Sequence, residues 1–170
     1  MKKLCMAFAI LCSGLTSHFA SAGEVKITWQ APDDYADIRP TNESREHFRE
    51  HVFKALGQVF TDLAKKLPDD VMWNVTVTDI DLAGDVRPGI RPTGGDIRIV
   101  KDIYWPRMSF TYVMTDTNGT VISEGKEDIS DMGFLMTRQL NTGNGDFPYE
   151  TKMLEDWFRQ QQKRQRFPAK

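Results

Sequence analysis

The chain has 170 residues, of which 40% are hydrophobic and 27% charged, with 22 basic against 24 acidic side chains. This length lets one domain bury a core without disulfides, and the acidic balance argues against nucleic-acid binding. The charge is uneven, because residues 159–170 carry five basic side chains and no acid. We therefore expect an acidic body that ends in a basic, frayed tail.

Residues 1–22 have the pattern of a cleaved secretory signal peptide. A basic start at Lys2-Lys3 precedes an apolar run over residues 4–15, and Ala20-Ser21-Ala22 fits the small-residue cleavage pattern. The run is too short to cross a bilayer, which needs about 20 apolar residues. A bulky leucine directly before Cys12 disfavours lipidation of that cysteine. We expect an exported, periplasmic protein that begins at Gly23 and has no transmembrane segment.

Both cysteines, Cys5 and Cys12, lie in this leader, so the mature chain has none. Thiol catalysis, thiolate metal sites and disulfides are thereby excluded from the mature chain. Loss of the leader also removes two lysines, which leaves 20 basic against 24 acidic side chains and a net charge of −4.

The first expected element is a half-buried strand over residues 25–29, where apolar and polar side chains alternate. After an extended connection over residues 32–40, Thr41 or Asn42 caps a helix that runs to about Lys66. Seven apolar side chains of this segment fall on one stripe at helical spacing, which predicts the main core helix. They are Phe48, Val52, Leu56, Val59, Phe60, Leu63 and Leu67.

Four more strands are expected, over residues 71–82, 96–100, 107–115 and 120–129. An irregular Gly- and Pro-rich loop over residues 84–95 separates the first two, and Asn118-Gly119 forms the turn of a hairpin between the last two. A short helical turn between residues 130 and 140 and a terminal helix from Pro148 complete the order.

This order predicts an α+β domain over residues 23–158. We expect a mostly antiparallel sheet of four to five strands, with a long helix and a C-terminal helix packed on one face.

Three long segments carry motifs of a known family. They are VTVTDIDLAG at residues 75–84, DIRIVKDIYWPRM at 96–108 and YETKMLEDWF at 149–158. They resemble the domain-of-unknown-function family 3016, and the likeness covers essentially the whole mature chain. The resemblance implies a small exported proteobacterial protein of a Gram-negative cell envelope. It implies no activity, cofactor or catalytic residue.

Residues 47–51 (HFREH) match the H-x-x-E-H motif of zinc proteases. His47 and His51 would bind zinc from successive helical turns, and Glu50 would activate a bound water. However, both histidines are expected to project away from the core stripe, whereas a protease buries this face beneath its substrate. We favour a solvated helix face, and a metal-dependent hydrolase using these three residues is an alternative.

Asp79, Asp81 and Asp85 near a strand end form a second candidate metal site. An EF-hand calcium loop that starts at Asp79 would need an oxygen ligand at Ala83 and a glutamate at Ile90, so the fit fails twice. Asp79 and Asp81 share one strand face. The simpler interpretation is that these carboxylates pair with Arg87, Arg91 or Arg98.

The densest mixture of charged and aromatic side chains lies between residues 96 and 107. A groove floored by aromatic rings and rimmed by arginines could hold a sugar, a peptide or an anionic ligand. The alternative is a strand with buried aromatics and satisfied ion pairs. The candidate binding residues are Arg98, Lys101, Asp102, Tyr104, Trp105 and Arg107.

The sequence contains no G-x-S-x-G, P-loop or dinucleotide-binding motif, and we expect no cofactor. It favours a non-enzymatic periplasmic binding or accessory module of the cell envelope. Its partner would be an envelope protein or a small ligand, and not nucleic acid. The alternatives are the metal-dependent hydrolase and contact of the basic tail with an anionic membrane surface.

Overall fold

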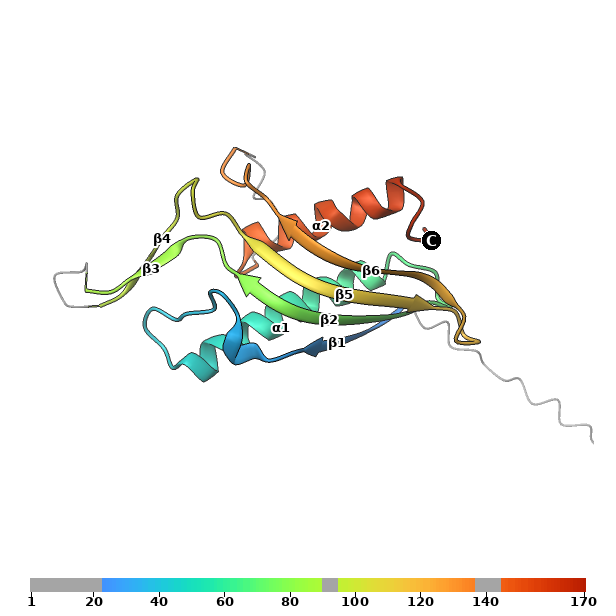
Figure 1. Ribbon diagram of the computed structural model, residues 1–170, viewed down its shortest axis with the longest axis horizontal. Coiled ribbons are helices and arrows are strands. Elements are labelled where there is room, and N and C mark those ends of the chain that lie inside the picture. Colours follow the sequence, from blue (N-terminus) through green and yellow to red (C-terminus); the bar gives the residue numbers. More distant parts are fainter. Residues whose placement is uncertain (1–22, 90–94, 137–144) are drawn as a thin grey trace, which may run out of the picture.

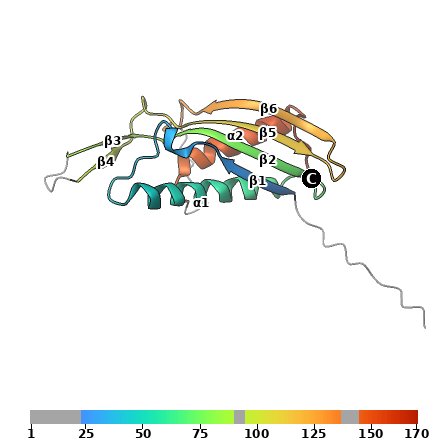
Figure 2. The same ribbon diagram turned by 60° about the horizontal axis from the view of Figure 1, so that its bottom comes forward.

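A computed structural model describes residues 23–89, 95–136 and 145–170. Four strands form one sheet in the order β1-β2-β5-β6, and both helices lie on the same face of it (Figures 1 and 2). A short 3-10 helix at Pro32–Asp34 follows β1, and β3 pairs with β4 outside the sheet. The elements are β1 (Glu24–Trp29), α1 (Arg45–Ala64), β2 (Met72–Asp81), β3 (Asp85–Arg87), β4 (Ile97–Ile99), β5 (Arg107–Thr115), β6 (Val121–Ser130) and α2 (Pro148–Lys163).

The sheet is mostly antiparallel, which confirms the α+β prediction. β2 pairs antiparallel with β5, and β5 with β6. β1 and β2 are parallel, because α1 carries the chain back along the sheet between them. No helix of the described segments is long and apolar enough to span a membrane.

Helix α1 is the main core helix, as its apolar stripe predicts. It begins later than expected, because Ser44 and not Thr41 or Asn42 is the N-cap. The Ser44 hydroxyl accepts a hydrogen bond from the backbone N–H of His47 at 3.2 Å. A side-chain oxygen three residues before an N–H is in the position that satisfies this otherwise unpaired donor. The fully buried part of the stripe is Val52, Leu56, Phe60, Leu63 and Leu67.

Strand β2 changes its buried face at a register shift between Val77 and Asp79. Before the shift, Trp73, Val75 and Val77 face the helices, and after it Ile80 is buried instead. A bulge inserts one unpaired residue, so the side chains beyond it turn over. This turn leaves the carboxylates that follow Val77 outside the core, near the end of the sheet.

Two connections differ from the sequence prediction. The expected irregular loop over residues 84–95 contains β3, and the expected strand over 96–100 is its partner β4, so neither extends the main sheet. Residues 132–136 form turns and not a helix, and the N–H of Asp131 donates to the carbonyl of Pro106 at 3.3 Å. The predicted leader, Arg91 and residues 137–144 lie outside the described residues.

The C-terminal segment is ordered, in contrast to the frayed tail expected from residue 159. Helix α2 continues to Lys163, and the Phe167 side chain is only 3% exposed. Burial of one such ring releases about 2 kcal/mol, which helps to offset the entropy lost when the last residues become ordered. Phe167 packs against the rings of Trp73, Tyr112, Trp157 and Phe158.

Candidate functional site

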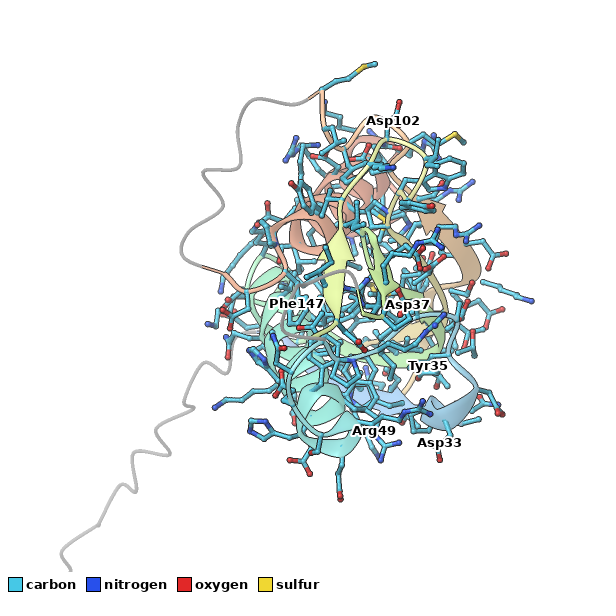
Figure 3. The ribbon with its side chains drawn as sticks, turned by 90° about the vertical axis from the view of Figure 1, so that its left-hand side faces the viewer. Asp33, Tyr35, Asp37, Arg49, Asp102 and Phe147 are labelled. Carbon is cyan, nitrogen blue, oxygen red and sulfur yellow. The ribbon has the colours of Figure 1, made fainter. Side chains whose placement is uncertain are left out.

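A pocket of about 400 Å³ lies where β2 ends and β5 begins. Figure 3 shows this end of the molecule, with Asp37 close to the β3–β4 hairpin and Asp102 at the upper edge. The walls come from the loop after β1, the end of β2, the hairpin and the segment before β5. We call it the aspartate–aromatic pocket, and its lining residues are Ala36, Asp37, Arg39, Asp81, Gly84, Asp85, Ile103, Tyr104, Trp105 and Arg107.

One wall of the pocket is a cross-strand ion pair. Asp81 and Arg107 stand opposite each other in the β2–β5 register, and Nε of Arg107 donates to Oδ2 of Asp81 at 2.9 Å. The guanidinium carbon of Arg107 lies 6.0 Å from the centre of the Trp105 ring, within the range of a cation–π contact. The prediction that Asp81 pairs with Arg87, Arg91 or Arg98 is therefore wrong, because strand register brings Arg107 closest.

Arg98 lies behind the pocket and joins three chain segments. Its guanidinium donates to Oδ2 of Asp37 at 2.9 Å and to the carbonyl of Arg39 at 3.0 Å, with longer contacts to the carbonyls of Ala83 and Gly84. The side chain of Asp37 is 9% exposed and that of Arg98 18%, so this pair is largely buried. Arg98 thus ties the hairpin to the loop after β1 and to the end of β2.

Asp37 is fixed by its backbone as well as by its side chain. Its N–H donates to the carbonyl of Ile80 at 3.0 Å, and its carbonyl accepts from the N–H of Leu82 at 3.1 Å. These bonds align Asp37 with Asp81 as a short parallel bridge. The loop after β1 therefore continues the edge of the sheet next to the pocket.

Gly84 forms the turn from the sheet into the hairpin. Its φ angle is +92°, and a Cβ atom there would come within 2.9 Å of Cγ of Arg98 and 3.0 Å of the carbonyl oxygen of Ile99. The Gly84 N–H donates to the carbonyl of Tyr104 at 2.9 Å. Within β3, Arg87 pairs with Asp85 at 2.6 Å, and it also donates to the Tyr104 hydroxyl at 2.8 Å, so both the backbone and the hydroxyl of Tyr104 are held.

Glu150, at the start of α2, is a buried acid behind the pocket. It is 2% exposed, and its Oε1 accepts a hydrogen bond from the N–H of Ala83 at 2.7 Å. Burial raises the pKa of the Glu150 carboxyl, and the bond from Ala83 and the charge of Arg98 oppose that rise. Glu150 and Arg98 also border a second pocket of about 240 Å³, whose walls include Phe48, Val100 and Phe147.

The six candidate binding residues occupy three different environments. Tyr104, Trp105 and Arg107 line the aspartate–aromatic pocket. Arg98 supports it from behind. Lys101 and Asp102 are exposed on the loop before β5 and do not line the pocket.

Sequence reasoning missed Asp37, Arg39 and Glu150. Glu150 had a signal, because it precedes Met153 and Leu154 by three and four residues and so lies on the buried stripe of α2. Asp37 and Arg39 lie in a connection with no periodic pattern, so no signal in the sequence placed them beside β2.

The three candidate metal-binding aspartates are engaged separately. Asp79 accepts a hydrogen bond from the N–H of Ala36 at 2.7 Å, whereas Asp81 and Asp85 line the pocket and each pairs with an arginine. Within the described residues, no three His, Cys, Asp or Glu side chains are grouped as a metal site would require.

The histidines of the H-x-x-E-H segment each contact a different carboxylate. Nδ1 of His47 lies 2.5 Å from Glu43, and its side chain is 74% exposed. Nε2 of His51 lies 2.7 Å from Asp146, and its ring packs edge-on against Phe147. The two rings therefore have separate acidic partners.

Comparison with known proteins places the chain in a family without supplying an activity. No curated protein matches it. A solved structure, the minor lipoprotein from Acinetobacter baumannii, is 14% identical over 88% of this chain and 98% of its own, with a TM-score of 0.28. The model of the DUF3016 family, described as protein of unknown function, matches residues 23–160. The chain belongs to the DUF3016 family, as the resemblance of its motifs predicted.

Proposed function

We propose that the protein is a periplasmic, non-enzymatic binding module of the cell envelope that holds a small polar ligand in the aspartate–aromatic pocket. One observation carries the proposal. Asp81, Asp85, Tyr104 and Trp105 come from separate parts of the chain and line one pocket of about 400 Å³, a size typical of small-molecule sites. The signal-peptide pattern of residues 1–22 supports a periplasmic location.

The chemistry of the walls favours a sugar or a short peptide over a strongly ionic ligand. The Asp81 and Asp85 carboxylates already pair with Arg107 and Arg87. A charged ligand would have to compete with these pairs, whereas hydroxyl and amide groups can bond to the remaining lone pairs and N–H groups. The rings of Tyr104 and Trp105 add flat surfaces that pack against a sugar ring or a peptide plane.

The same pairing supports binding rather than catalysis. A general base needs a pKa near the working pH and access to the proton that it removes. Three carboxylates line the pocket, those of Asp37, Asp81 and Asp85, and each is engaged by an arginine. Carboxylates held in this way fit a recognition role better than proton transfer.

Binding is best tested by NMR titration of the protein with two probes, the disaccharide of N-acetylglucosamine and an alanine dipeptide. We expect amide shifts confined to the pocket walls with at least one probe. Trp105→Ala should weaken that binding by about tenfold, since loss of an aromatic contact costs roughly 1–2 kcal/mol.

The matched controls are Lys101→Ala and Asp102→Ala. They lie on the same loop but outside the pocket, so both should bind like the wild type. If neither probe binds, or if Trp105→Ala binds as tightly as the controls, the pocket does not hold a ligand of this class.

A further inference from the structure

The C-terminal ends of both helices lie together at the end of the molecule opposite the pocket (Figure 1). Lys65 and Arg164 are the C-cap residues of α1 and α2. We define the cationic end as six exposed basic residues at this place: Lys65, Lys66, Lys163, Arg164, Arg166 and Lys170. We propose that the cationic end is a docking surface for the anionic lipid headgroups of a membrane.

The first support is that these cations are held on a folded surface. Phe167 is buried, the N–H of Arg166 donates to the carbonyl of Gln161 at 3.0 Å, and Nζ of Lys170 lies 2.5 Å from Asp69. Charges on a fixed surface can approach a flat layer of headgroups at the same time. A frayed tail would lose more conformational entropy for the same contacts.

The second support is the local excess of positive charge. The acids in the adjoining stretch are Asp62, Asp69 and Asp70, and the first two already pair with Lys65 and Lys170. Glu24 and Asp116 lie at the neighbouring strand ends, because Met72 pairs with Glu24 on one side and with Thr115 on the other. Six basic and five acidic side chains then leave a net charge of +1 at this end, whereas residues 23–170 as a whole have −4. Of the six residues of the cationic end, Lys66, Lys163, Arg164 and Arg166 make no ion pair with another described residue.

Cations at helix C-termini also have an ordinary structural reason, because they complement the negative end of the helix dipole. That effect accounts for one or two charges in the last turn of each helix. It does not account for Arg166, which follows the end of α2 and makes no ion pair among the described residues, whereas Lys170 already pairs with Asp69. The excess beyond the helix ends favours an external anionic partner.

Gly23, where the described chain begins, also lies at this end of the molecule. A Cβ atom built on Gly23 would meet Ala64, Leu67 and Pro68, and the N–H of Glu24 donates to the carbonyl of Val71 at 3.1 Å. The described chain therefore begins beside the C-terminal end of α1.

Docking in this orientation has a consequence for the pocket. The β3–β4 hairpin and the C-terminus lie at opposite ends of the long axis (Figure 1). A domain whose cationic end rests on lipid would present the aspartate–aromatic pocket away from the membrane. The docking proposal does not depend on what that pocket binds.

Co-sedimentation of the chain Gly23–Lys170, which contains every described helix and strand, tests the proposal. Vesicles of equal parts phosphatidylethanolamine and phosphatidylglycerol should bind the protein, and vesicles of phosphatidylcholine alone should not. Replacing Lys163, Arg164 and Arg166 by glutamate should lower the partition coefficient at least about tenfold, since each basic group near the surface contributes to the attraction. Raising NaCl from about 0.05 to about 0.5 M should release the wild-type protein.

The matched control replaces Lys26, Lys54 and Lys126 by glutamate. These exposed lysines lie outside the cationic end, and the control changes the net charge by the same amount. Circular dichroism establishes that both triple variants fold. Equal loss of binding in both variants would show that only net charge matters and would overturn the proposal. So would equal binding of the wild type to the two kinds of vesicle, or to neither.

Discussion

At the pocket end, ionised side chains are neutralised by one another inside the protein. Asp37 and Arg98 form a largely buried pair, and Asp81, Asp85, Arg87 and Arg107 pair around the pocket walls. At the cationic end, four basic side chains make no ion pair within the described segments and point into water. The first end uses charge to hold chain segments in place, whereas the second leaves charge on its surface.

This difference determines what each end should be sensitive to. A buried ion pair keeps its strength in salt, but loss of one partner leaves a charge without compensation. Exposed charges contribute little to folding, and their attraction to an external partner falls as salt rises. Substitutions at the pocket end should therefore change stability, and substitutions at the cationic end should change salt-dependent binding.

Arg98→Ala should lower the free energy of unfolding more than any other variant proposed here. It removes the guanidinium that donates to the 9%-exposed Asp37 side chain, which leaves Asp37 only its contacts with Arg39, and it separates the hairpin from the loop after β1. Breaking a buried pair from one side costs about 3–5 kcal/mol. Urea unfolding followed by circular dichroism measures the change.

Arg107→Ala is the control at the same end, because it removes an ion pair whose arginine is 57% exposed. Its cost should stay below about 1 kcal/mol. Equal losses in the two variants would show that burial does not distinguish the two pairs.

Phe167→Ala tests what orders the cationic end. The variant leaves a gap among Trp73, Trp157 and Phe158, and a Phe→Ala change in a core costs about 3 kcal/mol. Removal of residues 168–170 loses the exposed pair between Lys170 and Asp69 and the partly buried Pro168, and it should cost about 1 kcal/mol. If the truncation costs as much as Phe167→Ala, the surface ion pair and not the buried ring holds this end.

Gly84→Ala should cost about 2 kcal/mol, because it combines a positive φ with close contacts to Arg98 and Ile99. Gly119→Ala separates the two effects, since φ is +81° there but a Cβ would meet nothing within 4 Å. That variant should lose about 1 kcal/mol from backbone strain alone. Thermal unfolding measures both variants. If Gly84→Ala and Gly119→Ala lower the unfolding midpoint equally, the close contacts around Gly84 add nothing to the cost of the positive φ angle.

The sequence predicts the framework of the molecule better than either end. Periodic patterns placed α1, β1, β2, β5 and β6, because burial of one face imposes a regular spacing on each element. The pocket aromatics Tyr104 and Trp105 were also identified, from their density among charged residues. Such signals are local, and they suffice where an element forms its own pattern.

The partners of the charged residues could not be predicted in the same way. Asp37 meets Arg98 across 61 positions, and this contact depends on how the loop after β1 joins β2. The register shift near Val77 and the burial of Phe167 likewise depend on tertiary packing. Phe167 is a single aromatic residue beyond the end of α2, so it forms no periodic pattern. The sequence therefore predicted a frayed tail over residues 159–170.

Glu150→Gln should have the smallest effect on stability of these variants. It tests one property of the pocket end, the pH dependence that the buried Glu150 carboxyl causes. Burial raises the pKa of Glu150 above its ordinary value of 4.5, so the folded protein retains this proton at a pH where the unfolded chain has released it. The free energy of unfolding of the wild type therefore decreases as the pH rises from about 4.5 through the raised pKa of Glu150. Glutamine cannot titrate, and its amide oxygen can still accept from the N–H of Ala83.

The stability of Glu150→Gln relative to the wild type should consequently increase as pH rises through this window, whatever its value at the acidic end. Urea unfolding at a series of pH values measures the difference. Glu155→Gln removes a carboxylate from the same helix, where the side chain is only partly buried, and serves as the control for loss of one negative charge. A difference that stays constant with pH would mean that Ala83 and Arg98 stabilise the ionised carboxylate as strongly as burial destabilises it. The pocket end would then hold Glu150 as it holds Asp37, as a charge balanced within the protein.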